Sequence, residues 1–122
     1  MGEVRSHLDL EVWKVSIDFV VEIYKLTATF PDHEKYGLTS QIRRAAVSIP
    51  SNIAEGSARR NSKELIQFLY ISLGSVAEIE TQLILSKRLN YIKENQELSE
   101  KIHYIRVLIT RLIKSIKNKI NE

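Results

Sequence analysis

The sequence predicts an all-α protein that folds as an antiparallel, up-down four-helix bundle, with the second helix bent at Pro50. Four segments repeat apolar residues at steps of three and four, which places those side chains on one face of a helix. The four glycines and two prolines are few for the many turns of an all-β domain. The 122 residues suit a single domain, which we expect to span residues 1–122.

The first helix is expected near residues 9–29. We predict that its buried face carries five residues at alternating steps: Leu10, Trp13, Ile17, Val20 and Tyr24. Phe30, Pro31 and Asp32 follow, and the residue before a proline avoids the helical region of backbone space. The helix is therefore expected to end before this proline.

The second helix is expected near residues 38–57, where we expect Gly56 to end it in a left-handed conformation. Its predicted buried residues are Leu38, Ile42, Ala45, Ala46, Ile49 and Ile53. Pro50 removes a backbone donor and crowds the carbonyl of Ala46, so we expect a bend that Ser48, Ser51 and Asn52 partly repair. A polar stripe runs beside the buried face: Gln41, Arg44, Ser48, Asn52 and Glu55. This stripe is either a solvated or inter-subunit face, or a recognition surface.

The third and fourth helices are expected near residues 62–89 and 94–119. Asn61 and Glu64 form a plausible capping pair for the third helix. The third helix is predicted to bury Leu65, Leu69, Ser72, Val76, Ile79, Leu83 and Ser86. The fourth is predicted to bury Leu98, Ile102, Ile105, Ile109, Leu112 and Ile116. Short connections between such long helices favour antiparallel neighbours.

Both of these helices carry apolar residues beyond the predicted buried face. The additional residues are Phe68, Tyr70, Ile71 and Leu73 on the third helix, and Leu108 and Ile113 on the fourth. They either widen the core or form a subunit interface, because large exposed apolar patches are unusual on monomers. Gly74 and Ser75 fit both alternatives, since small residues let another helix approach closely.

The net charge is +3 and the isoelectric point about 9.2, but the charge is distributed unevenly. Residues 41–63 have a balance of +4 and residues 101–122 a balance of +5. This asymmetry permits an anionic partner. The candidate nucleic-acid-binding residues are Arg43, Arg44, Arg59, Arg60, Lys63, Arg106, Arg111, Lys114 and Lys117. A charged outer face for solubility is the alternative, and since aromatic residues do not interleave with either band, base stacking is not expected.

Catalytic chemistry finds little support in the residue pattern. Cysteine is absent, which excludes disulfides and thiolate metal ligands. Glu100 and His103 form one Glu-x-x-His, but helical di-iron sites need a second copy, which the sequence lacks. Phosphate-binding glycine motifs are also missing. Glu78 and Glu80 point about 200° apart on a helix, so we expect each to pair with an arginine such as Arg43 or Arg44 on a facing helix, within one subunit or across subunits. We expect no catalytic, cofactor or metal site.

Membrane insertion and secretion are not expected. The longest uninterrupted apolar run is well short of the roughly 18–20 residues that cross a bilayer. The N-terminal segment MGEVRSHLDLEVWK lacks the apolar region of a signal peptide. We expect a cytoplasmic protein.

Three segments carry a resemblance to a known family: DLEVWKVSIDFVVEIYKLTATFP, QIRRAAVSIPSNIAEGSAR, and FLYISLGSVAEIETQL with the following LNYI turn. They resemble the four-helix bundle family encoded within intervening sequences of 23S ribosomal RNA genes, over about residues 8–115. This family is similar in fold to the accessory protein of diversity-generating retroelements. The resemblance implies a bacterial helical bundle that assembles as a ring-like pentamer. The retroelement relative is basic and binds nucleic acid and a reverse transcriptase.

Two classes of function follow. In the first, the protein is a non-enzymatic homo-oligomer, with a pentamer favoured by the resemblance, that binds RNA or DNA electrostatically through basic helix faces. In the second, it is a protein–protein interaction adaptor without a physiological nucleic-acid ligand. The charge distribution and the resemblance favour the first.

Overall fold

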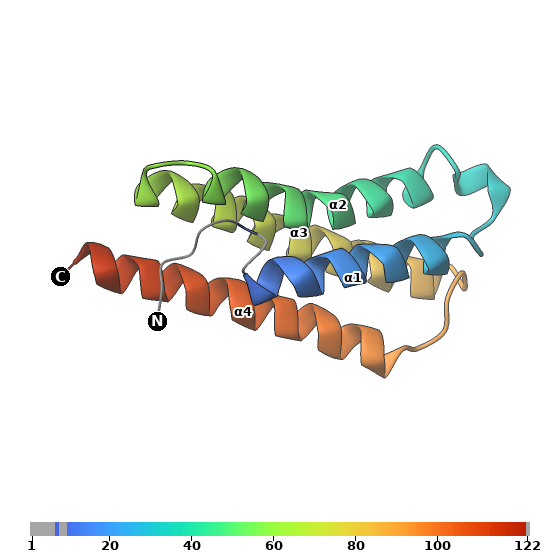
Figure 1. The fold of residues 1–122 in the computed structure, drawn as a ribbon. Helices are drawn as coiled ribbons and strands as arrows, with labels where there is room; N and C mark the ends of the chain where they lie inside the picture. Colours follow the sequence, from blue (N-terminus) through green and yellow to red (C-terminus); the bar gives the residue numbers. More distant parts are fainter. Residues whose placement is uncertain (1–6, 8–9, 122) are drawn as a thin grey trace.

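Four long helices form the protein, as the computed structural model shows for the part of the chain that it describes, which is His7 and residues 10–121. The helices are α1 (Glu11–Thr27), α2 (Leu38–Ser57), α3 (Ser62–Arg88) and α4 (Gln96–Ile120), and a short 3₁₀ turn, η2 (Asp32–Glu34), lies between the first two. Consecutive long helices run in opposite directions (Figure 1). The predicted all-helical bundle is confirmed, and its helix bounds agree within about two residues. The predicted start of the first helix at residue 9 lies outside the described residues.

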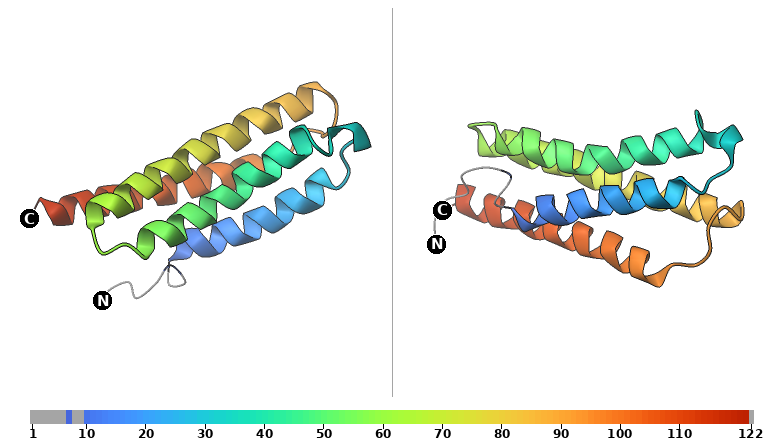
Figure 2. Two further views of the ribbon diagram at one scale, coloured as in Figure 1. Left: turned by 90° about the horizontal axis from the view of Figure 1, so that it is seen from above. Right: turned by 45° about the vertical axis from the view of Figure 1, so that its right-hand side comes forward.

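Each helix packs against two neighbours. Helix α1 contacts α2 and α4, and helix α3 contacts the same two helices. The contact between α2 and α3 is the most extensive (Figure 2). The largest fully buried side chains come from all four helices: Phe19, Ile23, Ile42, Ile49, Ile53, Leu69, Ile79, Ile105 and Ile109. One continuous apolar core therefore runs along the bundle.

The predicted faces of α2, α3 and α4 face the core, with Leu38, Leu65, Leu112 and Ile116 only half-buried at its margin. The face predicted for α1 is only partly right, because Leu10, Trp13 and Val20 are half-buried against the core but do not form its centre. The residues that α1 buries are Val12, Ser16, Phe19, Ile23 and Thr27. Of the predicted set, Ile17 and Tyr24 are 38% and 42% exposed. Helix α1 has apolar residues on two adjacent faces, and two core positions hold hydroxyl groups. The Ser16 and Thr27 hydroxyls donate to the carbonyl oxygens of Val12 and Ile23, at 2.6 and 2.8 Å, so both can be buried without an unsatisfied donor.

The prediction that Gly56 ends α2 in a left-handed conformation is also wrong. No glycine among the described residues has a positive φ, and α2 continues to Ser57. A Cβ at Gly56 would lie 2.8 Å from Phe68 Cβ and 3.0 Å from Leu65 Cδ1 of α3. Glycine is needed here for close packing between the two helices. At Gly74, by contrast, a Cβ would meet no described atom within 4 Å.

Helix α2 continues through Pro50, and hydrogen bonds connect the adjacent polar groups to α3 and to each other. The Asn52 amide donates to the carbonyl and hydroxyl of Ser48, at 2.8 and 2.9 Å. From α3, the buried Ser72 hydroxyl donates to the carbonyl of Ile49 at 3.0 Å. These bonds reach carbonyl groups beside the proline rather than that of Ala46. The bend at Pro50 stays a prediction.

By length and composition alone, α3 would suffice to cross a membrane. The core helices of water-soluble proteins pass the same test, and 39% of the most apolar window of α3 is buried in the bundle. The expectation that the protein has no membrane partner stays a prediction.

Candidate nucleic-acid interface

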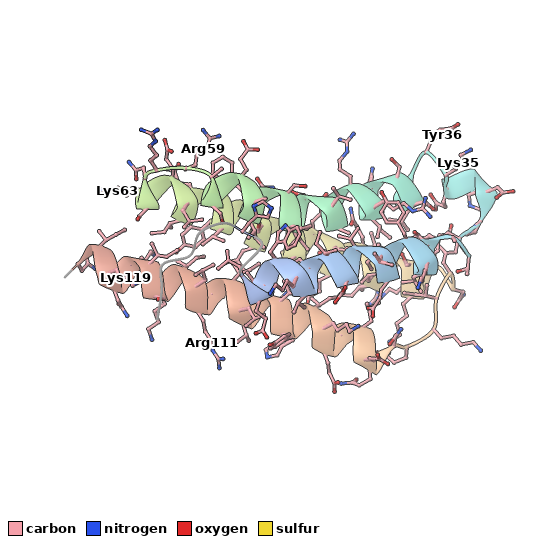
Figure 3. The ribbon with its side chains drawn as sticks, viewed as in Figure 1. Lys35, Tyr36, Arg59, Lys63, Arg111 and Lys119 are labelled. Atoms are coloured by element: carbon pink, nitrogen blue, oxygen red, sulfur yellow. The ribbon has the colours of Figure 1, made fainter. Side chains whose placement is uncertain are left out.

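Two basic segments that are far apart in the sequence lie at the same end of the bundle, on different sides of it (Figure 3). The connection from α2 to α3 and the C-terminal turns of α4 lie at this end, because α2 and α4 run in the same direction (Figure 1). We call this surface the basic end, and its members are Arg59, Arg60, Lys63, Lys114, Lys117 and Lys119. Figure 3 shows Arg59, Lys63 and Lys119 at this end. The nearby carboxylates in the described sequence are Glu55 and Glu64, so positive charge dominates.

Two members of the basic end are held by neighbouring side chains. Arg59 pairs with Glu55 at 3.0 Å, and its guanidinium lies 5.0 Å from the centre of the half-buried Phe68 ring. The Lys117 ammonium donates to the Tyr70 hydroxyl at 2.8 Å and lies 5.2 Å from the ring centre. The Arg59 pair is exposed on both sides, so it restrains the arginine weakly and does not bury its charge. Both cations therefore stay accessible to an anionic ligand.

Arg43 and Arg44 belong to the opposite end of α2. Arg43 closes the C-terminal turn of α1: its Nε donates to the Thr27 hydroxyl at 2.8 Å and its Nη2 to the carbonyl of Tyr24 at 3.2 Å. Its guanidinium also stacks on the Tyr24 ring, 4.5 Å from the ring centre. A cation that bonds the last carbonyl groups of a helix also complements the negative end of the helix dipole. Arg43 thus has a structural task, whereas Arg44 is exposed.

Arg106 is half-buried and joins α4 to α3 by donating to Glu80 at 2.8 Å. The expectation that Glu80 pairs with an arginine of α2 is therefore wrong, because Glu80 lies on the flank of α3 that faces α4. The contact of Glu78 is local, with the Gln82 amide donating to it at 3.4 Å. The candidate residue Arg111 is exposed on the outer side of α4 (Figure 3).

The additional apolar residues of α3 and α4 divide between surface and core. Tyr70 and Ile71 are 48% and 51% exposed, so both are available to a partner. Leu73 and Leu108 are half-buried and pack against the core. Of the two alternatives, core or subunit interface, Ile113 takes the first, because this side chain is 4% exposed and lies inside the bundle. At that position the wide apolar face of α4 is core.

Aromatic residues do not interleave with the basic bands in the sequence, but the fold brings aromatic rings beside basic side chains at both ends of the bundle. The turn η2 places Tyr36 beside the start of α2, and a surface hollow there is lined by Tyr24, Lys35, Tyr36, Arg43 and Arg44, among others. The sequence signal was available, because Lys35 and Tyr36 directly precede α2. Tyr36 lies outside the two basic bands of the sequence, so the charge distribution alone does not point to it.

The same end carries a cluster that joins two connections of the bundle. The Tyr91 hydroxyl donates to Glu34 Oε2 at 2.8 Å, and the backbone N–H of Leu38 donates to Glu34 Oε1 at 3.1 Å. His33 Nε2 lies 3.3 Å from the Tyr91 oxygen. The Leu38 N–H first, and then the Tyr91 hydroxyl, lower the pKa of Glu34, while the bond to this carboxylate raises the pKa of Tyr91. The arrangement closes the bundle end and caps the start of α2.

The histidines and carboxylates of the described residues form no group of three or more that could hold a metal ion. His103 is exposed on α4. One buried polar atom in this part of the chain has no hydrogen-bond partner, Gln82 Oε1.

The fold and these surfaces define a small helical-bundle protein with a basic end. The chain belongs to the 23S rRNA-intervening sequence protein family, whose model matches residues 8–122. It is similar to a solved structure from Bacteroides thetaiotaomicron, described as a protein with unknown function from the S23 ribosomal protein family. The two chains are 27% identical with a TM-score of 0.60, and the match covers 91% of this chain and 99% of the other. A search of curated protein sequences finds no match.

Proposed function

We propose that the protein is a non-enzymatic homo-oligomer that binds RNA or DNA electrostatically through its basic end. The observation that carries this proposal is that two distant basic segments lie at the same end of the bundle and together hold six lysines and arginines, with Glu55 and Glu64 as the carboxylates of these segments. A cation that contacts a phosphate releases a condensed counterion, and the affinity grows with the number of such contacts. Flexible lysines on an exposed surface contact phosphates without reading base edges, so binding is independent of sequence.

Self-association strengthens this proposal. Tyr70 and Ile71 expose apolar surface on α3, and Tyr70 also contacts Lys117 of the basic end. Burial of this surface between subunits would bring several basic ends together on one particle, and the resemblance favours a pentamer. Affinity for a polyanion would then rise steeply with the number of subunits that one strand contacts. Native mass measurement tests this part, and a monomer at micromolar concentration would contradict it.

Charge-neutralising variants test the nucleic-acid contact. Arg60, Lys63 and Lys114 are exposed and make no side-chain ion pair or hydrogen bond with other described residues, so their replacement by glutamine leaves the packing intact. The matched control replaces Lys25, Arg88 and Lys93, three exposed cations at the other end of the bundle, and changes the net charge equally.

The measurement is the affinity for a single-stranded RNA of mixed sequence, by anisotropy, across a salt series. For the basic-end variant, the slope of log affinity against log salt should fall by about 2 in magnitude, since each lost phosphate contact removes about 0.7. The control variant should keep a slope close to that of the wild type. Equal slopes for both triple variants would contradict the proposal.

A protein-interaction adaptor is the second candidate. Ile84 and Leu85 of α3, and Leu89 directly after it, are 55%, 47% and 50% exposed, and exposed apolar residues that gather in one place are typical of protein contacts. An adaptor of this kind would bind its partner with little dependence on salt. The salt series therefore separates the two candidates.

A further inference from the structure

Tyr36 is by far the most exposed large apolar or aromatic side chain among the described residues, at 90%. It lies between η2 and α2, and its ring projects from this turn away from the bundle (Figure 3). An aromatic ring gains free energy when it is covered, and its flat face is suited to stacking. The position therefore offers a ready contact for a ligand with a planar group.

Three cations lie on the same surface as this ring. The Lys35 ammonium lies 5.6 Å from the centre of the Tyr36 ring, and Arg43 and Arg44 line the same surface hollow. Figure 3 shows Lys35 and Tyr36 on the same turn. A second hollow also contains Tyr36 and Arg44 and includes one carboxylate, Glu78. Binding sites for single-stranded nucleic acid typically combine an exposed aromatic ring with several cations, as this surface does.

The cations differ in how they are held. The guanidinium of Arg43 is fixed by Thr27 and Tyr24, so its position is set before a ligand arrives. Lys35 and Arg44, by contrast, form no ion pair with another described residue. These two charges are therefore available to phosphate groups on either side of a stacked base.

We propose that Tyr36 stacks on an unpaired base of single-stranded nucleic acid, while Lys35 and Arg44 contact the flanking phosphates. This inference rests on the proposed function for the class of ligand and adds a second contact region at the opposite end of α2. The bases of a duplex are paired and stacked on one another, so they cannot cover the Tyr36 ring. The site thus gives the protein a preference for single strands that a basic surface alone lacks.

The two regions are close enough for one strand to bridge them. Arg44 and Arg59 are separated by 15 positions, which correspond to about 22 Å along a helix. A stacked single strand with one phosphate per roughly 3.4 Å covers this span with about seven nucleotides.

The test uses a ten-nucleotide single-stranded RNA with one 2-aminopurine, whose fluorescence falls when it stacks. The variants are Tyr36→Ala, which removes the ring, and Tyr36→Phe, which keeps it. Tyr36 is exposed, so neither change should alter the melting temperature. Tyr36→Ala should lose at least about fivefold in affinity for this strand, together with the fluorescence change, and should bind a duplex of equal length like the wild type. Tyr36→Phe should keep both properties of the wild type.

The outcomes separate this inference from the proposed function. Equal single-strand affinity of Tyr36→Ala and wild type would overturn the stacking site, even if the basic-end variant loses affinity. A loss in Tyr36→Ala beside an unchanged basic-end variant would support the stacking site and contradict the basic end. A Tyr36→Ala protein that binds RNA normally but changes its native mass would show that Tyr36 contacts another subunit, which also overturns the inference.

Discussion

The same substitution should have opposite effects at two glycines of this bundle. At Gly74, in the exposed middle of α3, a methyl group would meet no described atom within 4 Å. Gly74→Ala should therefore raise the free energy of unfolding by about 0.8–1.0 kcal/mol, the difference in helix propensity between the two residues. At Gly56 the new methyl group would lie 2.8 Å from Phe68 Cβ, an atom that moves only with the backbone of α3.

Two terms compete at Gly56. Overpacking costs about 1–3 kcal/mol, and the gain in helix propensity offsets up to about 1 kcal/mol. Gly56→Ala should therefore lower the free energy of unfolding by about 1 kcal/mol. With an unfolding entropy of about 2.1 cal/mol/K per residue, 1 kcal/mol corresponds to about 4 °C for this chain, so the two variants should melt about 8 °C apart.

Urea and thermal unfolding followed by circular dichroism at equal protein concentration measure both variants. A Gly56→Ala protein that is as stable as Gly74→Ala would refute the close packing of α2 on α3. A strong destabilisation by Gly74→Ala, with a change in native mass, would show that a second subunit packs closely at Gly74.

Three further predictions concern the core, a helix cap and pH. Ile109→Ala removes a fully buried side chain and should lower the free energy of unfolding by about 2–5 kcal/mol in urea titrations; a loss below about 1 kcal/mol would contradict its place in the core. Asn61→Ala removes the acceptor of the Lys63 N–H bond (2.7 Å) and should cost about 1 kcal/mol in the same assay, whereas an unchanged midpoint would argue against the cap. The stabilisation from ionised Glu34 is complete above its ordinary pKa of 4.5 and is lost as the pH falls through the lowered pKa of the folded state. Glu34→Gln should therefore melt below the wild type at pH 7 and nearly with it at about pH 2, and an equal difference at both pH values would refute the assignment.

Much of the fold could be predicted because apolar residues at steps of three and four mark the core-facing side of three helices. In α3 and α4, the steps of three and four select one face, and the structure buries it. Helix α1 shows where the pattern is insufficient. Its apolar residues cover two adjacent faces, and the face that is buried includes the hydroxyl groups of Ser16 and Thr27. Bonds from these hydroxyls to backbone carbonyls of the same helix let this face be buried, and a hydropathy pattern does not record them.

The candidate site was less predictable, because it depends on which segments meet in space. Two basic bands were recognised in the sequence as separate features, and the direction of α2 and α4 brings Lys63 and Lys119 to one end (Figure 3). An up-down bundle already implies this placement, so topology would have been a usable signal. The capping role of Arg43 was not predictable, since it requires the carbonyl of Tyr24 to lie within reach. Similarly, the pairing of Arg106 with Glu80 depends on which flank of α3 faces α4.

Mapping of backbone amide shifts during titration with a single-stranded RNA tests most directly whether the basic end binds nucleic acid. The account predicts that the largest shifts at low salt fall in residues 58–63 and 112–119, and that both groups saturate together because one surface holds the strand. Shifts confined to the α3–α4 connection, near residues 89–95, or an unchanged spectrum at RNA concentrations in excess of the protein, would contradict it.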